Sequence, residues 1–185
     1  MRLDAIDAIH ARRSIRDYAA RPVERSVIEA IVWDAAQTPS TPVSGETPWM
    51  FNVVEGSERI AAYGARALAY AREHRPPGPG YAWTEREDFS VFFNAPAVVV
   101  ISGRTDNDQA LQECVRAGQT LTISACARGL GTCWVGAPML WMRDAGVRAE
   151  LGVPEGWQPF AVFTLGYPRA LPQGRPRAKP AIIWS

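Results

Sequence analysis

The segment Ala97-Val98-Val99-Val100-Ile101 limits the possible folds more than any other part of the chain. It is entirely apolar, and four of its five residues are β-branched, which favours a strand. Because an apolar strand of this kind has no face suited to water, it must be buried. The 185 residues suffice for one domain of ordinary size that encloses such a strand.

Helical and strand patterns alternate on both sides of this strand. Apolar periodicity and turn residues predict helices at 4–13, 22–35, 58–72, 106–129 and 143–151, and strands at 49–54, 133–135 and 160–165. Asp106 and Gln109 resemble a capping box at the start of the longest helix, whose interior is rich in small residues. The three prolines between Arg75 and Gly80 predict a flexible loop or the hinge of a lid.

Composition argues against several classes of protein. Twenty basic and nineteen acidic residues leave a formal net charge of +1, which does not fit a general nucleic-acid binder. No apolar run is long enough to span a bilayer, and the N-terminal stretch lacks the apolar core of a signal peptide. Three cysteines without a C-x-x-C pair predict neither a disulfide framework nor a metal site, and favour the cytoplasm. With two histidines, chemistry is expected from a cofactor rather than from a hydrolytic triad.

Arg12-Arg13-Ser14-Ile15-Arg16 is the first candidate binding segment. Three guanidinium groups and a hydroxyl within five residues are what a terminal phosphate requires. Arginines at the end of a helix also complement its dipole in solvent, and the segment taken alone favours that simpler role.

Three further segments could bind a ligand, although each has a simpler structural role. The loop from Pro39 to Trp49 offers hydroxyls, or is a rigid surface loop that ends in a core tryptophan. The segment Gly129–Pro138 joins a helix to a strand, as an ordinary helix end does. It is not a dinucleotide fingerprint, because Trp134 stands where a third glycine is needed. The basic stretch Arg175–Pro180 is most simply a solvated tail.

The order and spacing of the four segments are more specific than any one of them. Arg-Arg-Ser-x-Arg near residue 12, then Pro-Ser to Pro-Trp, then Gly-Leu-Gly-Thr-Cys-Trp-Val-Gly near residue 130 and a late basic pair together resemble the nitroreductase family. The first and third segments match closely and the second and fourth in part. The resemblance covers nearly the whole chain.

The resemblance implies an α+β fold of three layers, in which helices flank a small, mainly antiparallel sheet, as a single domain at 1–185. It also implies an intertwined homodimer with FMN bound in the interface, where both chains contribute to each site. The small-residue face of the long helix would pack in this dimer. The C-terminal tail, 168–185, would reach across the partner subunit.

The resemblance assigns separate roles within the arginine segment. Arg12 and Ser14 would contact the phosphate and ribityl chain of FMN, with Arg13 beside them. Arg16 would lie near flavin N1 and O2, where a cation stabilises the reduced flavin and raises its potential. The other implied cofactor-binding residues are Pro39, Ser40, Gly45, Thr47, Trp134, Val135, Gly136, Ala137, Arg177 and Lys179.

Those other residues fall in the three remaining segments. The stretch from Trp134 to Ala137 would run past the flavin, with a backbone N–H near N5. Arg177 or Lys179 would add to the phosphate site, and Arg175 is a further choice. The loop departs from the family pattern, because Gly45 replaces an asparagine that usually hydrogen-bonds the flavin, and Thr47 replaces a glutamine. Thr47, Ser44 or the backbone could substitute.

The implied activity is that of an FMN-dependent NAD(P)H oxidoreductase. NADH or NADPH would deliver hydride to flavin N5, and a nitroaromatic, quinone or enone acceptor would then take its place. Such a ping-pong scheme needs no catalytic side chain. The aromatic segment from Trp83 to Phe93 is either the wall of the acceptor pocket or core packing.

Two groups of alternatives remain open. Within the same superfamily the chain could be a flavin-dependent dehydrogenase or resemble dimethylbenzimidazole synthases, which start with a similar Arg-Arg-Ser motif. From another class, it could be a flavin-binding protein without turnover, or a scaffold without flavin.

Overall fold

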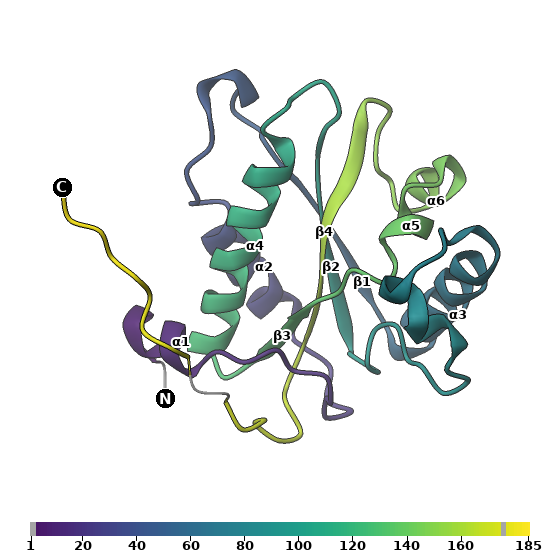
Figure 1. Ribbon diagram of the computed structural model, residues 1–185, viewed down its shortest axis with the longest axis horizontal. Coiled ribbons are helices and arrows are strands. Elements are labelled where there is room, and N and C mark those ends of the chain that lie inside the picture. Colours follow the sequence, from purple (N-terminus) through teal and green to yellow (C-terminus); the bar gives the residue numbers. More distant parts are fainter. Residues whose placement is uncertain (1–2, 175–176) are drawn as a thin grey trace.

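The computed structural model describes residues 3–174 and 177–185, and its centre is a four-stranded sheet (Figure 1). The strands are β1 (Met50–Glu55), β2 (Ala97–Arg104), β3 (Gly131–Trp134) and β4 (Trp157–Gly166). Their order is β1-β2-β4-β3, and every neighbouring pair is antiparallel. Helices cover both faces of the sheet, so the expected α+β fold of three layers is confirmed.

The predicted buried strand, 97–101, forms the first part of β2. Val99 and Ile101 point to the face covered by α2 (Arg25–Ala35) and α4 (Ala110–Ala127). Val98 and Val100 point to the other face, which α3 (Ser57–His74) and two shorter helices cover. Strand alternation thus gives each helical layer its own core, which is why neither face of this strand carries a polar residue.

The remaining helices are short. They are α1 (Ala5–Ala11), α5 (Met139–Met142) and α6 (Ala145–Glu150), together with the 3-10 helices η1 (Pro42–Ser44) and η2 (Pro79–Glu85). The helix α5 and the helical turns of η2 were not predicted. The proline-rich stretch does form a loop up to Gly78, but Pro79 occupies the first position of η2, where a missing N–H costs nothing.

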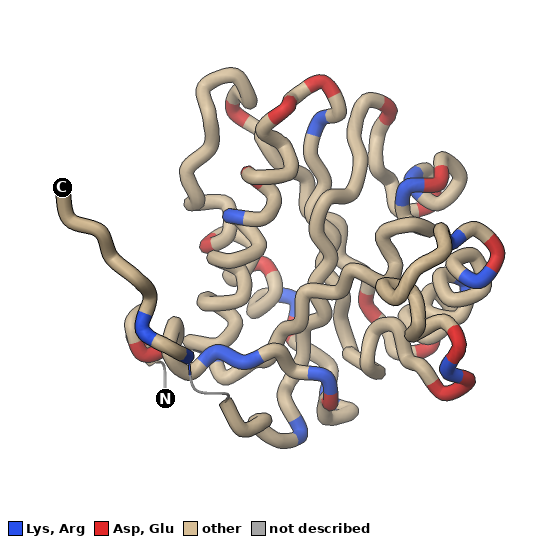
Figure 2. The backbone as a smooth tube through the Cα atoms, in the orientation of Figure 1, with Lys and Arg blue, Asp and Glu red and all other residues tan. Residues whose placement is uncertain are grey.

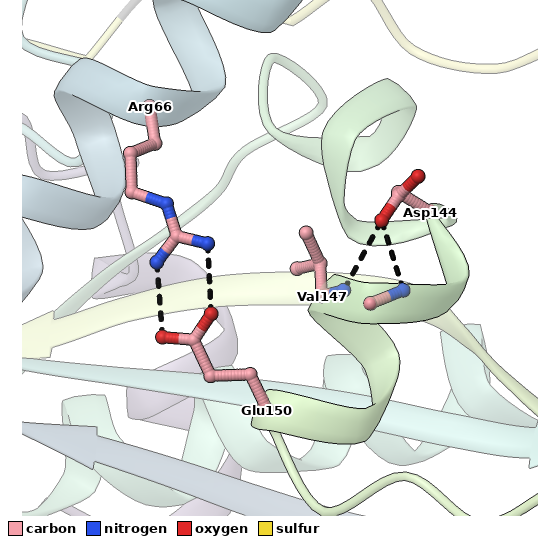
Figure 3. A network of polar contacts seen from close by, with 5 residues as sticks. Arg66, Asp144, Val147 and Glu150 are labelled. Atoms are coloured by element: carbon pink, nitrogen blue, oxygen red, sulfur yellow. Dashed lines mark hydrogen bonds and ion pairs between the residues drawn. The ribbon is translucent and has the colours of Figure 1, made fainter.

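The helix α6 shows how a local cap and a distant ion pair fix one element. Its N-cap, Asp144, accepts hydrogen bonds from the backbone N–H of Gly146 and Val147 at 2.9 and 3.2 Å (Figure 3). Two parallel bonds of 2.8 and 2.9 Å join Arg66 of α3 to Glu150 at the other end of α6. The cap satisfies two otherwise free donors, and the bidentate ion pair fixes how the far end of α6 lies on α3, although water screens its charges.

The predicted capping box at the start of α4 is wrong. The Asp106 carboxylate pairs with Arg104, whose Nε lies 2.9 Å from Oδ1, and α4 begins only at Ala110. The N-cap Gln109 makes no side-chain cap bond, and its own N–H is accepted by Asn107 Oδ1 at 2.9 Å. The Asp106 carboxylate therefore binds the Arg104 guanidinium instead of capping the helix as the local pattern predicts.

The small residues of α4 pack within the chain itself. Ala117, Gly118 and Ala125 are buried, and a Cβ on Gly118 would come 2.3 Å from Phe163 Cζ of β4. The small face therefore lets α4 approach the sheet closely. The expected use of this face in a dimer does not fit these contacts.

The start of the C-terminal tail also packs on its own chain. Ala19 N donates to Tyr167 O at 2.9 Å, and Arg169 N donates to Asp17 O at 3.1 Å. Further along, the backbone of Gly174 lies against the Arg13 guanidinium. Residues 177–185 then extend away from the body (Figure 1). Pro168, Arg169 and Gly174 thus contact their own chain, and the reach of the tail 168–185 across a partner stays a prediction.

Candidate functional site

The arginine segment lies along the edge of the sheet as an extension of it. Helix α1 ends at Ala11, and Arg12 adopts an extended conformation with ψ of 132°. Ser14 then forms a parallel bridge to Thr132 of β3, and Ile15 N donates to Thr132 O at 2.9 Å. Figures 1 and 2 show this stretch running from α1 past β3, with its arginines in blue.

Side chains alternate along the extended arginine segment, so its buried anchor and its candidate binding groups point to opposite sides. Ile15 points inward and is only 2% exposed, whereas Ser14 and Arg16 are exposed. The inward side chain lies on Gly131, where a Cβ would come 2.3 Å from Ile15 Cγ1. Gly131 is therefore needed for close packing and not only for the turn between α4 and β3.

A second anchor follows at Tyr18. Its hydroxyl donates to Ile15 O at 2.9 Å and lies 2.7 Å from Thr164 Oγ1, which also accepts from Cys133 N at 3.1 Å. Burial raises the pKa of Tyr18, so the phenol stays neutral and keeps donating over the ordinary pH range. The segment is thus tied to both β3 and β4.

The arginine segment and the segment Gly129–Pro138 meet around Trp134, which lines two neighbouring hollows. The smaller hollow has a volume of about 190 Å³ and is lined by Arg12, Ser14, Val115, Gln119, Thr122, Thr132, Trp134 and Phe163. The larger hollow has a volume of about 460 Å³ and is lined by Arg16, Gly80, Tyr81, Trp83, Phe89, Phe93, Cys133, Trp134, Val135, Gly136 and Ala137. Seven predicted site residues therefore line two adjacent hollows: Arg12, Ser14, Arg16, Trp134, Val135, Gly136 and Ala137.

The arginines of this region carry positive charge that no ion pair of the described residues offsets. Among residues 3–174 and 177–185, no carboxylate forms a salt bridge with Arg12, Arg13 or Arg16. Arg12 lines the smaller hollow and Arg16 the larger one. Guanidinium groups without a counter-ion beside a hollow suit a ligand that carries a negative group.

Arg13 has a structural role that sets it apart from the other two arginines. Its Nη1 donates to the carbonyl oxygens of His10 and Arg12 at 2.7 and 2.9 Å, which satisfies acceptors at the end of α1. Its guanidinium also packs on Gly174. Arg13 lines neither hollow, so its contacts support the segment instead of facing the expected phosphate site.

In the segment Gly129–Pro138, only some backbone N–H groups are free to donate to a ligand. Gly129, with φ of 77°, ends α4, and β3 leads to the half-exposed Trp134. Val135 is buried and donates its N–H to Val162 O at 2.8 Å, so it cannot also donate to a ligand. In the described part of the chain the N–H groups of Gly136 and Ala137 have no acceptor. They are therefore better candidates for the expected bond to a flavin.

The aromatic segment from Trp83 to Phe93 contributes both to core packing and to the wall of the larger hollow. Phe92 is buried in the core beside α3, where the ring lies 3.5 Å from the position of a Cβ on Gly64. Trp83, Phe89 and Phe93 line the larger hollow. Both roles are thus present, in different residues.

The hydroxyl-rich loop is not brought to the two hollows. Pro39, Ser40, Gly45 and Thr47 are exposed, and none of them lines either hollow. Figure 1 shows the loop beside the first turn of α4, whereas the arginine segment lies beyond its last turn. The loop runs along α4 between its first turn and its middle, because Thr41 N donates to Glu113 Oε1 at 2.7 Å and Thr38 Oγ1 lies 2.7 Å from Thr120 Oγ1.

A buried carboxylate that the sequence did not single out holds this loop. Glu113 of α4 is fully buried, and its Oε1 accepts from Thr41 N, Thr41 Oγ1 and Ser44 Oγ at 2.7, 2.8 and 2.6 Å. Asn107 Nδ2 donates to Oε2 at 3.2 Å. Ser44 is buried by this contact, so it does not fit the expected substitute for the missing asparagine. Helical spacing from Ala110 and Ala117 was the available signal, because it puts Glu113 on the buried face.

We expect Glu113→Gln to lower the free energy of unfolding by about 1–3 kcal/mol at pH 7, because an amide NH₂ would face donors. Burial alone would raise the pKa of Glu113, but the bonds from Ser44, Thr41 and Asn107 outweigh it and hold the pKa below its ordinary value of 4.5. A depressed folded-state pKa stabilises the protein above the unfolded pKa, and this stabilisation is lost as the pH falls through the folded value. Urea unfolding at several pH values should therefore show the difference from wild type shrinking in acid. Glu29→Gln, on the exposed face of α2, is the control, and an equal effect of both changes would contradict the assignment.

The predicted basic residues of the tail leave the body beside the arginine segment. Arg177 and Lys179 are exposed, and the contact of Gly174 with Arg13 sets where the tail departs. Arg175 and Pro176 lie outside the described residues.

Tyr18, like Glu113, was not singled out as a structural residue from the sequence. Its only signal was a large aromatic ring two residues after Arg16.

Within 3–174 and 177–185 no group of three His, Cys, Asp or Glu side chains is arranged to hold a metal ion. None of the helices in the described ranges combines the length and apolar character needed to cross a membrane.

Comparison with known proteins gives consistent results along the chain. Residues 9–167 match the model of the Nitroreductase family. The chain is 31% identical over 178 residues to a protein of Methanothermobacter thermautotrophicus provisionally named NADH dehydrogenase/NAD(P)H nitroreductase, covering 94% of this chain and 82% of that protein. It is 29% identical over 182 residues to the 5,6-dimethylbenzimidazole synthase of Rhodospirillum rubrum, covering 90% and 83% of the two chains.

Solved structures share the fold at lower sequence identity. A nitroreductase with bound FMN from Bacteroides fragilis superposes with a TM-score of 0.86 at 23% identity, and the match covers 99% of both chains.

Proposed function

Since the chain belongs to the nitroreductase family, we propose that it is an FMN-dependent oxidoreductase that uses NADH or NADPH to reduce an organic acceptor. The observation that carries the proposal is the set of uncompensated guanidinium groups beside the two hollows that meet at Trp134. FMN fits this donor set, because it combines a phosphate dianion with a flat ring that becomes anionic when reduced. The acceptor class that we propose is a nitroaromatic, a quinone or an enone.

The residues present suggest how FMN would be held. Arg12 and Ser14, in the smaller hollow, would bind the phosphate and ribityl chain. Arg16, in the larger hollow, would stabilise negative charge on the ring, and Gly136 and Ala137 would donate backbone hydrogen bonds. When bound, FMN supplies the ability to accept two electrons from a nicotinamide and to pass them on.

The protein's own contribution is binding, orientation and shielding from water. Burial raises the pKa of the Cys133 thiol in the larger hollow, and Arg16 opposes this without reversing it, so Cys133 stays a neutral thiol near pH 7. Trp83, Phe89 and Phe93 form an apolar wall there that suits a flat acceptor. No side chain needs to act as a general base under this proposal.

We also propose that the active form is a cytoplasmic homodimer. The predicted loop residues are exposed and line neither hollow of their own chain, which favours a site in which the loop comes from the partner subunit. Large apolar side chains are exposed on α1 and the tail: Ile6, Ile9, Leu171, Ile182, Ile183 and Trp184. Arg177 and Lys179 would reach a phosphate from this tail. Light scattering of the purified protein tests the assembly, and a monomer that retains FMN would contradict it.

The similarity to a dimethylbenzimidazole synthase favours a second candidate function, in which the bound flavin is consumed.

One experiment distinguishes these functions. Purified protein is loaded with FMN, mixed anaerobically with NADH or NADPH in a stopped-flow instrument, and then exposed to an acceptor or to air. Bleaching by NAD(P)H and full return of the flavin absorbance on adding a quinone support the reductase. Loss of the yellow colour in air supports the second candidate. Bound flavin that NAD(P)H does not reduce indicates a protein without turnover, and failure to bind FMN contradicts the whole proposal.

A further inference from the structure

The guanidinium of Arg16 has a neighbour that the proposed site does not otherwise need. Its central carbon lies 5.8 Å from the centroid of the Phe93 ring, within the range of a cation–π contact. In the described ranges no carboxylate pairs with Arg16. A long side chain without an ionic partner keeps many rotamers unless packing restricts it. The Phe93 ring therefore restrains where this charge lies, together with the Cys133 thiol, whose pKa burial raises and the same guanidinium lowers in part.

The backbone at Phe93 is in a conformation that its side chain disfavours. Phe93 and Asn94 have φ of 54° and 55°, and they are the only non-glycine residues with positive φ in the described ranges. A bulky residue adopts this region only where surrounding contacts hold it there. Ser90 provides them, because its carbonyl accepts from Phe93 N and its Oγ accepts from Asn94 N, both at 3.2 Å.

The left-handed turn sends two adjacent rings in different directions. Phe92 enters the core beside α3, whereas Phe93 lines the larger hollow and packs on the cluster of Ile15, Tyr18 and Ala95. Ile15 and Tyr18 are the anchors of the arginine segment. The Phe93 ring therefore contacts both the anchors of the segment and the guanidinium at its end.

We propose that Phe93 is a positioning residue that holds the Arg16 guanidinium at the larger hollow, so that Arg16 can stabilise the negative charge of reduced FMN. The inference rests on the proposed function. Phe89 is a neighbouring ring on the same wall, 6.3 Å from Phe93 and edge-on to it, but its cation–π partner is Arg86 and not Arg16. Phe89 thus provides a matched comparison.

The test measures the midpoint potential of the FMN-loaded protein by spectral titration against a reference dye, and the affinity of the apoprotein for oxidised FMN. We expect Phe93→Leu to lower the preference for reduced over oxidised FMN about fivefold, the upper range for an exposed cation–π contact. For a two-electron couple this is a potential lower by about 20 mV. Phe93→Trp keeps a ring face and should retain the wild-type potential. If Phe93→Leu loosens the fold, Phe93→Met takes its place, because methionine also removes the ring.

Two controls separate positioning from general damage to the pocket. Phe89→Leu removes a ring from the same wall without a contact to Arg16, so it should shift the potential less than Phe93→Leu does. In the Arg16→Gln background Phe93→Leu should have no further effect on the potential. Equal shifts in Phe89→Leu and Phe93→Leu, or a shift that persists without Arg16, would overturn the inference. Wild-type protein that binds no FMN would instead refute the proposed function, so the two failures are distinguishable.

Discussion

Arg12→Ala should weaken FMN binding about ten- to a hundredfold, which is the loss expected for one charge-assisted contact to phosphate, about 1.5–3 kcal/mol. Arg12 lines the smaller hollow, and within the described residues its side chain makes no hydrogen bond or salt bridge. Removing it should therefore change the free energy of unfolding by less than about 0.5 kcal/mol. The affinity is measured by quenching of FMN fluorescence on titration with apoprotein.

The control for Arg12→Ala is Arg59→Ala, which removes an arginine from α3 on the other face of the sheet and should bind FMN like wild type. Arg12→Lys should fall between the two, because a lysine keeps the charge and loses the planar fork. Unchanged affinity in Arg12→Ala, or an equal loss in Arg59→Ala, would count against the assignment of the phosphate site.

The main elements of the fold could be predicted because their signals are local. The β-branched run at 97–101 and the helical spacing of Val27, Ile28, Ile31 and Ala35 follow from periods of the backbone itself. The helix α5 could not be predicted in this way, since four residues are too few to show a period. Partner choice was also out of reach, as Asp106 shows: its local pattern fits a cap, but Arg104 binds it instead.

The same limit applies to the site. The order of motifs predicted that Ser14 and Trp134 belong together, and both line the smaller hollow. It could not reveal that Glu113 fixes the loop at 41–44, since that contact joins residues about seventy positions apart. Nor could it assign Arg13 to the end of α1, because three neighbouring arginines look alike until their surroundings are known. Residues that face a ligand are found from their chemistry, whereas residues that position them are found only from packing.

Gly131→Ala is the second prediction with a large effect, and it tests packing instead of charge. The added Cβ would lie 2.3 Å from Ile15 Cγ1 and 2.8 Å from Ile15 Cβ, well inside contact distance. Ile15 cannot yield easily, because it is buried and its N–H is bound to Thr132 O at 2.9 Å. The whole arginine segment must shift. We expect the free energy of unfolding to fall by about 1–3 kcal/mol, as for other overpacked sites.

Such a shift should also weaken FMN binding more than Arg12→Ala does, because Arg12, Ser14 and Arg16 move together. Gly80→Ala is the control, since a Cβ there meets no atom within 4 Å and should leave stability unchanged. Ile15→Ala alone should cost about 2–5 kcal/mol, but it removes the Cγ atoms that clash. The double variant should therefore be more stable than the sum of the two single changes predicts. Strict additivity in urea unfolding, with FMN affinity unaffected by Gly131→Ala, would mean that this glycine does not set the position of the arginine segment.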